Sequence, residues 1–217
     1  MYLAIEGVIG VGKTTLARLL QPTFQSELLL EVFEENPFLS DFYADRERYA
    51  FQTQTFFLLS RYHQQRRTVQ EILAGGNNLI ADYTFEKDAL FAQINLKGDE
   101  LDMYYRVHEA LAEKIVPPDL IVYLRADTDV LMQRIASRDR PYERNMERDY
   151  IAELIRAYEA FFADNQNRRS PVLVLDTNEL DYVRRVEDLN QAERRIRQAL
   201  KLPPFQPELP LPILHGE

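Results

Sequence analysis

Cysteine is absent from this 217-residue chain, which excludes disulfides, thiolate catalysis and cysteine-based zinc sites. Long apolar runs are absent too, since none approaches the roughly 18 residues that a membrane-spanning helix needs. The N-terminal stretch MYLAIEGVIG has an acidic residue at position 6 and lacks the basic region of a signal peptide. We therefore expect a cytoplasmic protein without a membrane segment.

Basic residues are outnumbered by acidic ones. The chain has 26 lysines and arginines against 35 acidic residues, a net charge of −9. Proteins that coat nucleic acid need a basic surface, so nucleic acid is not an expected partner. A small nucleotide can still bind in a locally positive pocket.

Apolar segments alternate with segments of helical periodicity. We predict strands at residues 2–6, 28–33, 77–82, 119–126 and 171–176. We predict helices at 13–24, 45–73, 149–163 and 182–200, with further helical segments between them. This alternation implies parallel pairing, so we expect one α/β domain over residues 1–200, with a five-stranded parallel sheet flanked by helices on both faces. Residues 201–217 hold five of the eleven prolines and cannot form regular helix; they are either a loose end or an extended strap on the surface.

The stretch GVIGVGKT follows the first predicted strand and satisfies the P-loop pattern. Its glycines let backbone N–H groups crowd around a polyphosphate, and the following helix adds its positive dipole end. A chance match in a glycine-rich loop is the alternative, but the position between strand and helix favours the functional interpretation. We expect ATP or another nucleoside triphosphate to bind with Mg²⁺, which Thr14 would help hold, while Lys13 reaches the phosphates. The expected nucleotide-binding residues are Gly7, Gly10, Val11, Gly12, Lys13, Thr14 and Thr15.

Three carboxylates lie close together at the end of the second predicted strand and just after it, at Glu31, Glu34 and Glu35. Phosphoryl transfer to a hydroxyl requires removal of a proton, and a positioned carboxylate can accept it. Glu31 lies near the strand's carboxyl end and is the candidate base. Glu34 and Glu35 are expected to begin the next turn, where acids complement the helix dipole. Alternatively, all three are solvated turn residues.

Five segments occur in an order that resembles the deoxyribonucleoside kinase family, most closely its bacterial deoxyadenosine/deoxyguanosine kinase branch. They are AIEGVIGVGKTTLA, EVFEENPFLSDFY, FQTQTFFLLSRYHQQ, LIADYTFEKDALFAQ and RIASRDRPYE, and the resemblance covers about residues 1–200. It implies the P-loop kinase fold, a homodimer, and ATP-dependent phosphorylation of a deoxyribonucleoside 5′-hydroxyl in nucleotide salvage. It also assigns the general base to Glu31.

Gln54 and Arg61 are seven residues apart and would share one helix face. The Gln54 amide offers both a donor and an acceptor to a nucleobase edge. On the residues alone, these side chains and Asp88 could equally be ordinary surface groups. The resemblance implies that Gln54 pairs with the base, and that the Arg61–Asp88 pair points to deoxyadenosine, deoxyguanosine or deoxycytidine. It further implies substrate contacts from Tyr43 and Glu143 to the sugar 3′-hydroxyl, and from Phe85 and Phe91 to the base.

Asp82 ends the third predicted strand, where an acid can hold magnesium directly or through water. A simple helix N-cap is the alternative. The resemblance favours the metal role, with Glu31 a weaker candidate ligand. The family pattern has arginine after this acid, close to the substrate's 5′ end, but this chain has Tyr83 there. Asp82 and Tyr83 are therefore also expected among the substrate-binding residues.

Arg134, Arg138 and Arg140 cluster before PYERNMER, in the position of the family's arginine-rich lid. Guanidinium groups neutralise the charge that develops during phosphoryl transfer, so all three are candidate catalytic residues. A charged helix end is the alternative. Asp139 stands where the family often has glycine. Asp181 and Tyr182 follow the fifth strand and are expected to frame the adenine of ATP.

Two other functions compete. A thymidylate-type monophosphate kinase shares the N-terminal motif, but Tyr83 and Glu31 argue against it. A non-catalytic scaffold relative should have lost Lys13, Thr14, Glu31 or the lid arginines, and all are present.

Overall fold

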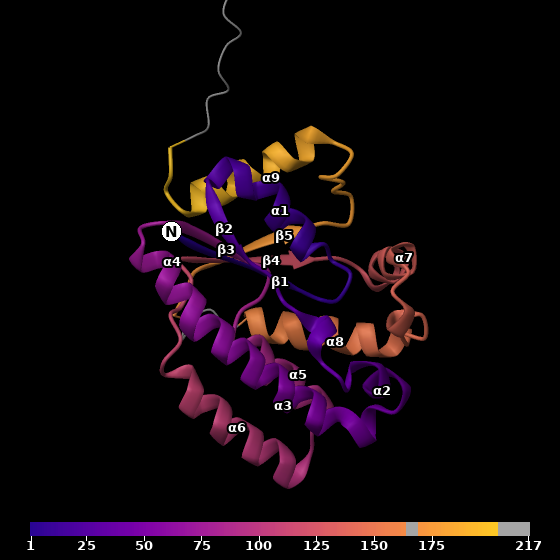
Figure 1. Cartoon of the computed structure of the whole chain (residues 1–217). Helices are drawn as coiled ribbons and strands as arrows, with labels where there is room; N and C mark the ends of the chain where they lie inside the picture. Colours follow the sequence, from indigo (N-terminus) through magenta and orange to yellow (C-terminus); the bar gives the residue numbers. More distant parts are fainter. Residues whose placement is uncertain (164–168, 204–217) are drawn as a thin grey trace, which may run out of the picture.

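The sheet has five parallel strands, as predicted, and their order is β2-β3-β1-β4-β5 (Figure 1). The structure is a computed structural model that describes residues 1–163 and 169–203, so residues 204–217 of the proline-rich tail lie outside the described residues. The strands are β1 (Tyr2–Gly7), β2 (Ser26–Leu29), β3 (Asn78–Ala81), β4 (Leu120–Arg125) and β5 (Val172–Asp176).

Helices cover both faces of this sheet, which confirms the expected layers (Figure 1). Helices α1 (Lys13–Phe24) and α9 (Val186–Ala199) lie on one face. On the other lie α3 (Arg46–Gln64), α5 (Lys87–Asn95) and α8 (Arg148–Ala163), with α6 (Gly98–Ala112) packed outside α3 and α5. The remaining helices are α2 (Leu39–Ala44), α4 (Gln70–Ala74), α7 (Thr128–Arg138), the π-helical turn Gln65–Val69 and the 3-10 turns Phe33–Glu35 and Pro141–Glu143.

Two element boundaries differ from the prediction by more than two residues. The second strand ends at Leu29 rather than at residue 33, because the backbone N–H of Glu31 donates to the Asp82 side chain (2.8 Å) instead of continuing the ladder. The last helix begins at Val186 rather than at residue 182, because Asp181 forms a turn there and accepts from the N–H of Arg184 (3.0 Å).

The central strand β1 positions the loop that follows it. Its residues are buried along its whole length, and it lies between β3 and β4. The chain crosses from one side of β1 to the other between β3 and β4, so β1 opens at a topological switch point, where ligands of such sheets bind.

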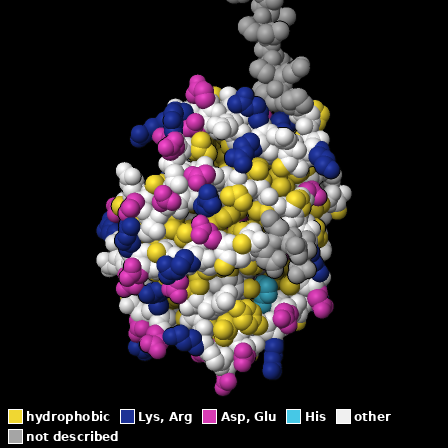
Figure 2. All heavy atoms as spheres, turned by 180° about the vertical axis from the view of Figure 1, so that it is seen from behind, with side chains coloured by type: hydrophobic (Ala, Val, Ile, Leu, Met, Phe, Trp, Pro, Cys, Tyr) yellow, Lys and Arg dark blue, Asp and Glu magenta, His cyan; other side chains and the backbone are white. Residues whose placement is uncertain are grey.

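The described surface carries mixed charge. On the face shown in Figure 2, acidic and basic side chains are interspersed around a central area of hydrophobic side chains. In the ranges 1–163 and 169–203, no helix is both long enough and apolar enough to cross a bilayer.

Candidate active site

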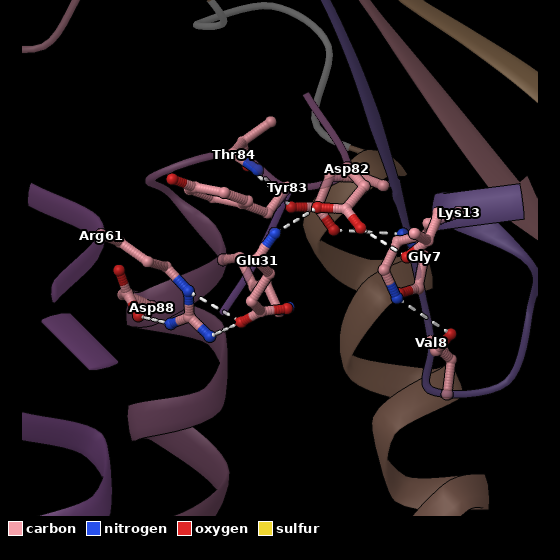
Figure 3. A network of polar contacts seen from close by, with 12 residues as sticks. Gly7, Val8, Lys13, Glu31, Arg61, Asp82, Tyr83, Thr84 and Asp88 are labelled. Atoms are coloured by element: carbon pink, nitrogen blue, oxygen red, sulfur yellow. Dashed lines mark hydrogen bonds and ion pairs between the residues drawn. The ribbon is translucent and has the colours of Figure 1, made fainter. Parts of the chain in front are cut away.

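The loop between β1 and α1 has the conformation that its glycines permit. Gly7 has a φ of 147°, and a Cβ there would lie 2.5 Å from the backbone oxygen of Leu124. Gly12 has a φ of 100° and begins α1 without a side-chain cap, which leaves the helix N-terminus open to an anion. Lys13 Nζ donates to the carbonyl oxygens of Gly7 (2.7 Å) and Val8 (3.3 Å) (Figure 3). The ammonium group is therefore held at the mouth of the loop.

Desolvation changes the acidity of Lys13. Together with repulsion from the nearby Lys87 ammonium, it lowers the pKa of Lys13 to about 8. A phosphate beside Lys13 would favour the charged form again. This lysine is consequently suited to respond to a bound polyphosphate.

Thr14 and Asp82 meet at the edge of the same cleft. The Thr14 hydroxyl donates to Asp82 Oδ2 at 2.5 Å, while Asp82 Oδ1 accepts from the Glu31 N–H. Within the described residues, no group of three or more His, Asp or Glu side chains could hold a metal ion by itself. Mg²⁺ is commonly held by one or two protein oxygens together with substrate phosphates and water, so a hydroxyl paired with a carboxylate suits it.

Glu31 reaches this cleft by an indirect path. Strand β3 separates β2 from β1, so β2 is not adjacent to the P-loop strand. The hydrogen bond from Glu31 to Asp82 carries the chain beyond β2 across the end of β3. The predicted base thus enters the cleft from a loop rather than from a strand end.

Two cations hold the Glu31 carboxylate. Oε1 accepts from Nε (3.0 Å) and Nη2 of Arg61, and Oε2 accepts from Lys87 Nζ at 2.6 Å. The Glu31 side chain is 14% exposed. Burial alone would raise the pKa of Glu31, but Arg61 and Lys87 hold it well below the usual range of a glutamate. Glu31 is therefore ionised at neutral pH and has a defined orientation.

Arg61 links Glu31 to a second, fully buried carboxylate. Its Nη1 donates to Asp88 Oδ1, and its guanidinium lies 4.6 Å from the centroid of the Phe57 ring (Figure 3). Asp88 is 0% exposed. The predicted Arg61–Asp88 pair is thus present, joining α3 to α5.

One cavity brings most of the predicted residues together. Its P-loop end is lined by Gly10, Lys13, Thr14, Glu31 and Asp82, and Gln54 and Arg61 lie further along the wall. The aromatic part of the wall is formed by Phe33, Phe42, Tyr43, Phe57, Phe91, Tyr142 and Tyr150. A phosphate site and an aromatic, hydrogen-bonding compartment therefore share one space.

The lid arginines bind a buried glutamate. Arg138 donates to both oxygens of Glu143 (2.8 and 2.7 Å), and Arg140 lies 3.7 Å from it. Arg138, Arg140 and Glu143 line the cavity, and the Arg140 guanidinium also lies 4.0 Å from the Phe33 ring centroid. Asp139 has a φ of 48°, a left-handed conformation that aspartate tolerates better than most residues. This conformation explains why the family often has glycine at this position.

Other predicted residues lie beside the cavity rather than on its wall. Arg134 donates to Thr177 O (2.6 Å), Thr177 Oγ1 (3.1 Å) and Val11 O (3.4 Å). The Tyr182 hydroxyl donates to the carbonyls of Val11 (3.3 Å) and Gly12 (3.4 Å). The segment containing Asp181 is thus attached to the outer side of the P-loop. Catalysis by Arg134 and ATP binding by Asp181 and Tyr182 stay predictions.

Tyr83 and Phe85 are not brought to the cavity wall. Tyr83 is 0% exposed, packs in a small core cluster with Tyr2 and donates to Gln64 Oε1 at 2.5 Å. Phe85 stacks on His108 with ring centroids 4.7 Å apart. Both side chains pack inward in the loop after β3, so direct substrate contact by either would require rearrangement.

Sequence reasoning missed two charged residues. Lys87 lines the cavity and holds Glu31. Glu6 is 1% exposed and accepts from the N–H groups of Gly7 (3.1 Å) and Thr84 (2.6 Å), which joins the P-loop to the loop after β3 (Figure 3). Lys87 could have been found from the sequence, because the absence of the family's arginine at position 83 prompts a search for another cation nearby.

Residues 3–201 match the sequence profile of the family described as Deoxynucleoside kinase. The deoxyguanosine kinase of Bacillus subtilis (strain 168) is 33% identical over 201 residues, covering 92% of this chain and 97% of that protein. The deoxyadenosine kinase of Dictyostelium discoideum is 32% identical over 183 residues, covering 82% of this chain and 73% of that protein. The solved structure of deoxyadenosine kinase from M. mycoides with bound dCTP is similar, with a TM-score of 0.78 and 25% identity, covering 91% of this chain and 100% of that one.

Proposed function

The chain belongs to the deoxynucleoside kinase family, and we propose that it transfers the γ-phosphoryl group of ATP to the 5′-hydroxyl of a purine deoxyribonucleoside. One observation carries the proposal: the ionised Glu31 carboxylate shares a cavity with Lys13 and Thr14 of the P-loop. An acceptor hydroxyl and a triphosphate can meet between them. The product is a deoxyribonucleoside 5′-monophosphate.

Glu31 accepts the proton of the 5′-hydroxyl. As the bond from the 5′-oxygen to the γ-phosphorus forms and the bond to the bridging oxygen of ADP breaks, that proton passes to the carboxylate. A carboxylate with a lowered pKa is a weak base toward a free alcohol. In a loose transition state the alcohol becomes acidic only as its bond to phosphorus forms, so an ionised, correctly placed acceptor suffices.

Positive groups stabilise the transferring phosphoryl. Lys13 binds the β- and γ-phosphates, and Arg138 and Arg140 neutralise charge on the equatorial oxygens. Thr14 and Asp82 would hold Mg²⁺, which would supply positive charge to offset that of the phosphates. The family and the Thr14–Asp82 contact support this assignment.

The nucleoside lies in the aromatic compartment. Gln54 is 2% exposed on the wall and reads the base edge, while Arg61, fixed by Asp88, lies beside it. Tyr43 and Glu143 bind the sugar 3′-hydroxyl. The similarity of the chain to deoxyguanosine and deoxyadenosine kinases supports a purine substrate.

A substrate panel tests this function. ATP and Mg²⁺ are supplied with each of the four deoxyribonucleosides, and with thymidylate as a monophosphate control. We expect turnover of deoxyadenosine or deoxyguanosine and none of thymidylate. Turnover of thymidylate alone would make the protein a monophosphate kinase, and silence across the panel would favour a non-catalytic scaffold.

We also propose a cytoplasmic homodimer. Met103 and Val107, one turn apart on α6, are 48% and 38% exposed, and Leu59 on the neighbouring α3 is 43% exposed. Such side chains suit a helical dimer face. Light scattering should give twice the chain mass, and Met103→Glu should reduce it to the monomer. The matched control is Val183→Glu, at a 69% exposed position far from these helices in sequence; equal masses for both variants would contradict this face.

A further inference from the structure

Lys87 is a buried ammonium group without a role in the reaction as described so far. Its side chain is 7% exposed, in the first turn of α5, and it lines the cavity that contains Glu31 and the P-loop. Its Nζ lies 2.6 Å from Glu31 Oε2. Burying an ammonium group is costly, and even an ion pair can fail to offset the desolvation of its two charges. The buried Lys87–Glu31 pair is therefore not explained by stability alone.

The two oxygens of Glu31 are not equivalent. Oε1 accepts twice from Arg61, through Nε and Nη2, which occupies both of its lone-pair directions. Oε2 accepts from Lys87 and keeps one lone pair for another donor. The 5′-hydroxyl can therefore approach only the oxygen that Lys87 holds.

We propose that Lys87 is a positioning residue, which orients Glu31 so that Oε2 receives the proton of the 5′-hydroxyl. This inference rests on the proposed kinase function. Arg61 alone binds only Oε1, so the Glu31 carboxylate could still rotate and move Oε2. Lys87 adds a second point of attachment from a different helix, so the carboxylate has a single orientation.

The surrounding charges fit this role. Lys87, Glu31 and Lys13 all line the same cavity, so the Lys87 ammonium lies in the space that the P-loop also borders. Tyr83, four residues before it, is buried and uncharged at the place where the family pattern has a cation. Lys87 supplies a positive group from the first turn of α5 instead.

A double-mutant cycle tests the inference. Lys87→Gln, Glu31→Gln and the double variant are compared with the wild type for kcat and for the KM of nucleoside and ATP. We expect Lys87→Gln to reduce kcat about 10²-fold, the scale of a misplaced reacting group, with both KM values within about threefold. Because Lys87 acts through Glu31, the substitution should reduce kcat no further in the Glu31→Gln background.

Two further variants separate charge from packing. Lys87→Arg should recover at least about tenfold over Lys87→Gln, since it restores a cation. Lys114→Gln, at an exposed lysine after α6, should match the wild type. A Lys87→Gln variant with wild-type kcat would overturn the inference, as would losses that multiply in the double variant.

A measurement without turnover keeps the inference separate from the proposed function. If the wild type phosphorylates no nucleoside, the kinase proposal fails, but thermal unfolding of the same four proteins still reports the contact. We expect the decrease in unfolding temperature of the double variant to be smaller than the sum of the decreases in the two single variants. Additive shifts would refute the Lys87–Glu31 coupling.

Discussion

Replacing Glu31 with glutamine removes the proposed proton acceptor while preserving the size of the side chain. General-base catalysis contributes about 10²–10⁴-fold to rate. At about 1.36 kcal/mol per factor of ten, the barrier should rise by roughly 3–5 kcal/mol. The effect should fall on kcat, because the proposed triphosphate contacts are made by Lys13 and Thr14 and not by Glu31.

The same substitution affects stability. Removing one partner of a buried ion pair costs about 3–5 kcal/mol. The cost here should be smaller, because Arg61 remains paired with Asp88 and the Glu31 side chain is 14% exposed. Unfolding of Glu31→Gln should therefore occur at a lower temperature but still well above assay temperature.

The assay follows product formation by chromatography at saturating ATP and deoxyribonucleoside, with ATP affinity measured by calorimetry. Glu35→Gln is the matched control, because Glu35 is an exposed acid in the adjoining 3-10 turn. We expect the control to keep wild-type kcat. Near-wild-type kcat in Glu31→Gln would refute the assignment of the base, and loss of ATP binding would show that the cleft had been disrupted instead.

Three further predictions follow from the same contacts. Arg140→Gln should reduce kcat about 10²-fold as the loss of one charge-stabilising donor, whereas Arg144→Gln, at an exposed arginine, should not; equal kcat values would contradict a catalytic lid. Desolvation and a neighbouring ammonium lower the pKa of Lys13 to about 8, so the free protein loses that proton above pH 8 and ATP binding takes it up again. Calorimetry at pH 8.5 in two buffers of different ionisation enthalpy should then give different apparent enthalpies, and identical values would exclude the linkage. Tyr83→Phe should cost about 1–2 kcal/mol in unfolding free energy by leaving Gln64 Oε1 without its donor, with kcat unchanged; a large loss of kcat would instead support the predicted substrate contact.

The fold could be predicted because its signals are local. Apolar runs separated by amphipathic segments fix the α/β alternation, and all five strands lie where these runs predicted them, within a few residues. The exception is the end of β2, where LLLEVF reads as a continuous strand. A side chain more than fifty positions away, Asp82, takes the N–H of Glu31 and ends the ladder, and no local pattern contains that information.

The site was predictable to the extent that its residues belong to motifs. The P-loop places Gly12, Lys13 and Thr14 by spacing alone, and the resemblance identified Glu31, Gln54 and the lid. Tyr83 was expected near the substrate because it takes the place of the family's arginine, but its side chain lies in the core. Consecutive residues of a loop can point in opposite directions, and the direction depends on packing partners such as Tyr2 from another strand.

By itself the sequence determined the class of fold, the presence of a phosphate-binding loop and the family. Those properties depend on periodicity and on contiguous motifs, which are encoded within short stretches of chain. Only the tertiary structure decided that Arg61 and Lys87 share Glu31, and that Oε2 is the oxygen left open to a substrate. These three side chains come from two helices and a loop, so their meeting depends on how helices pack over the sheet, and electrostatics then sets their charge states at the distances that packing imposes.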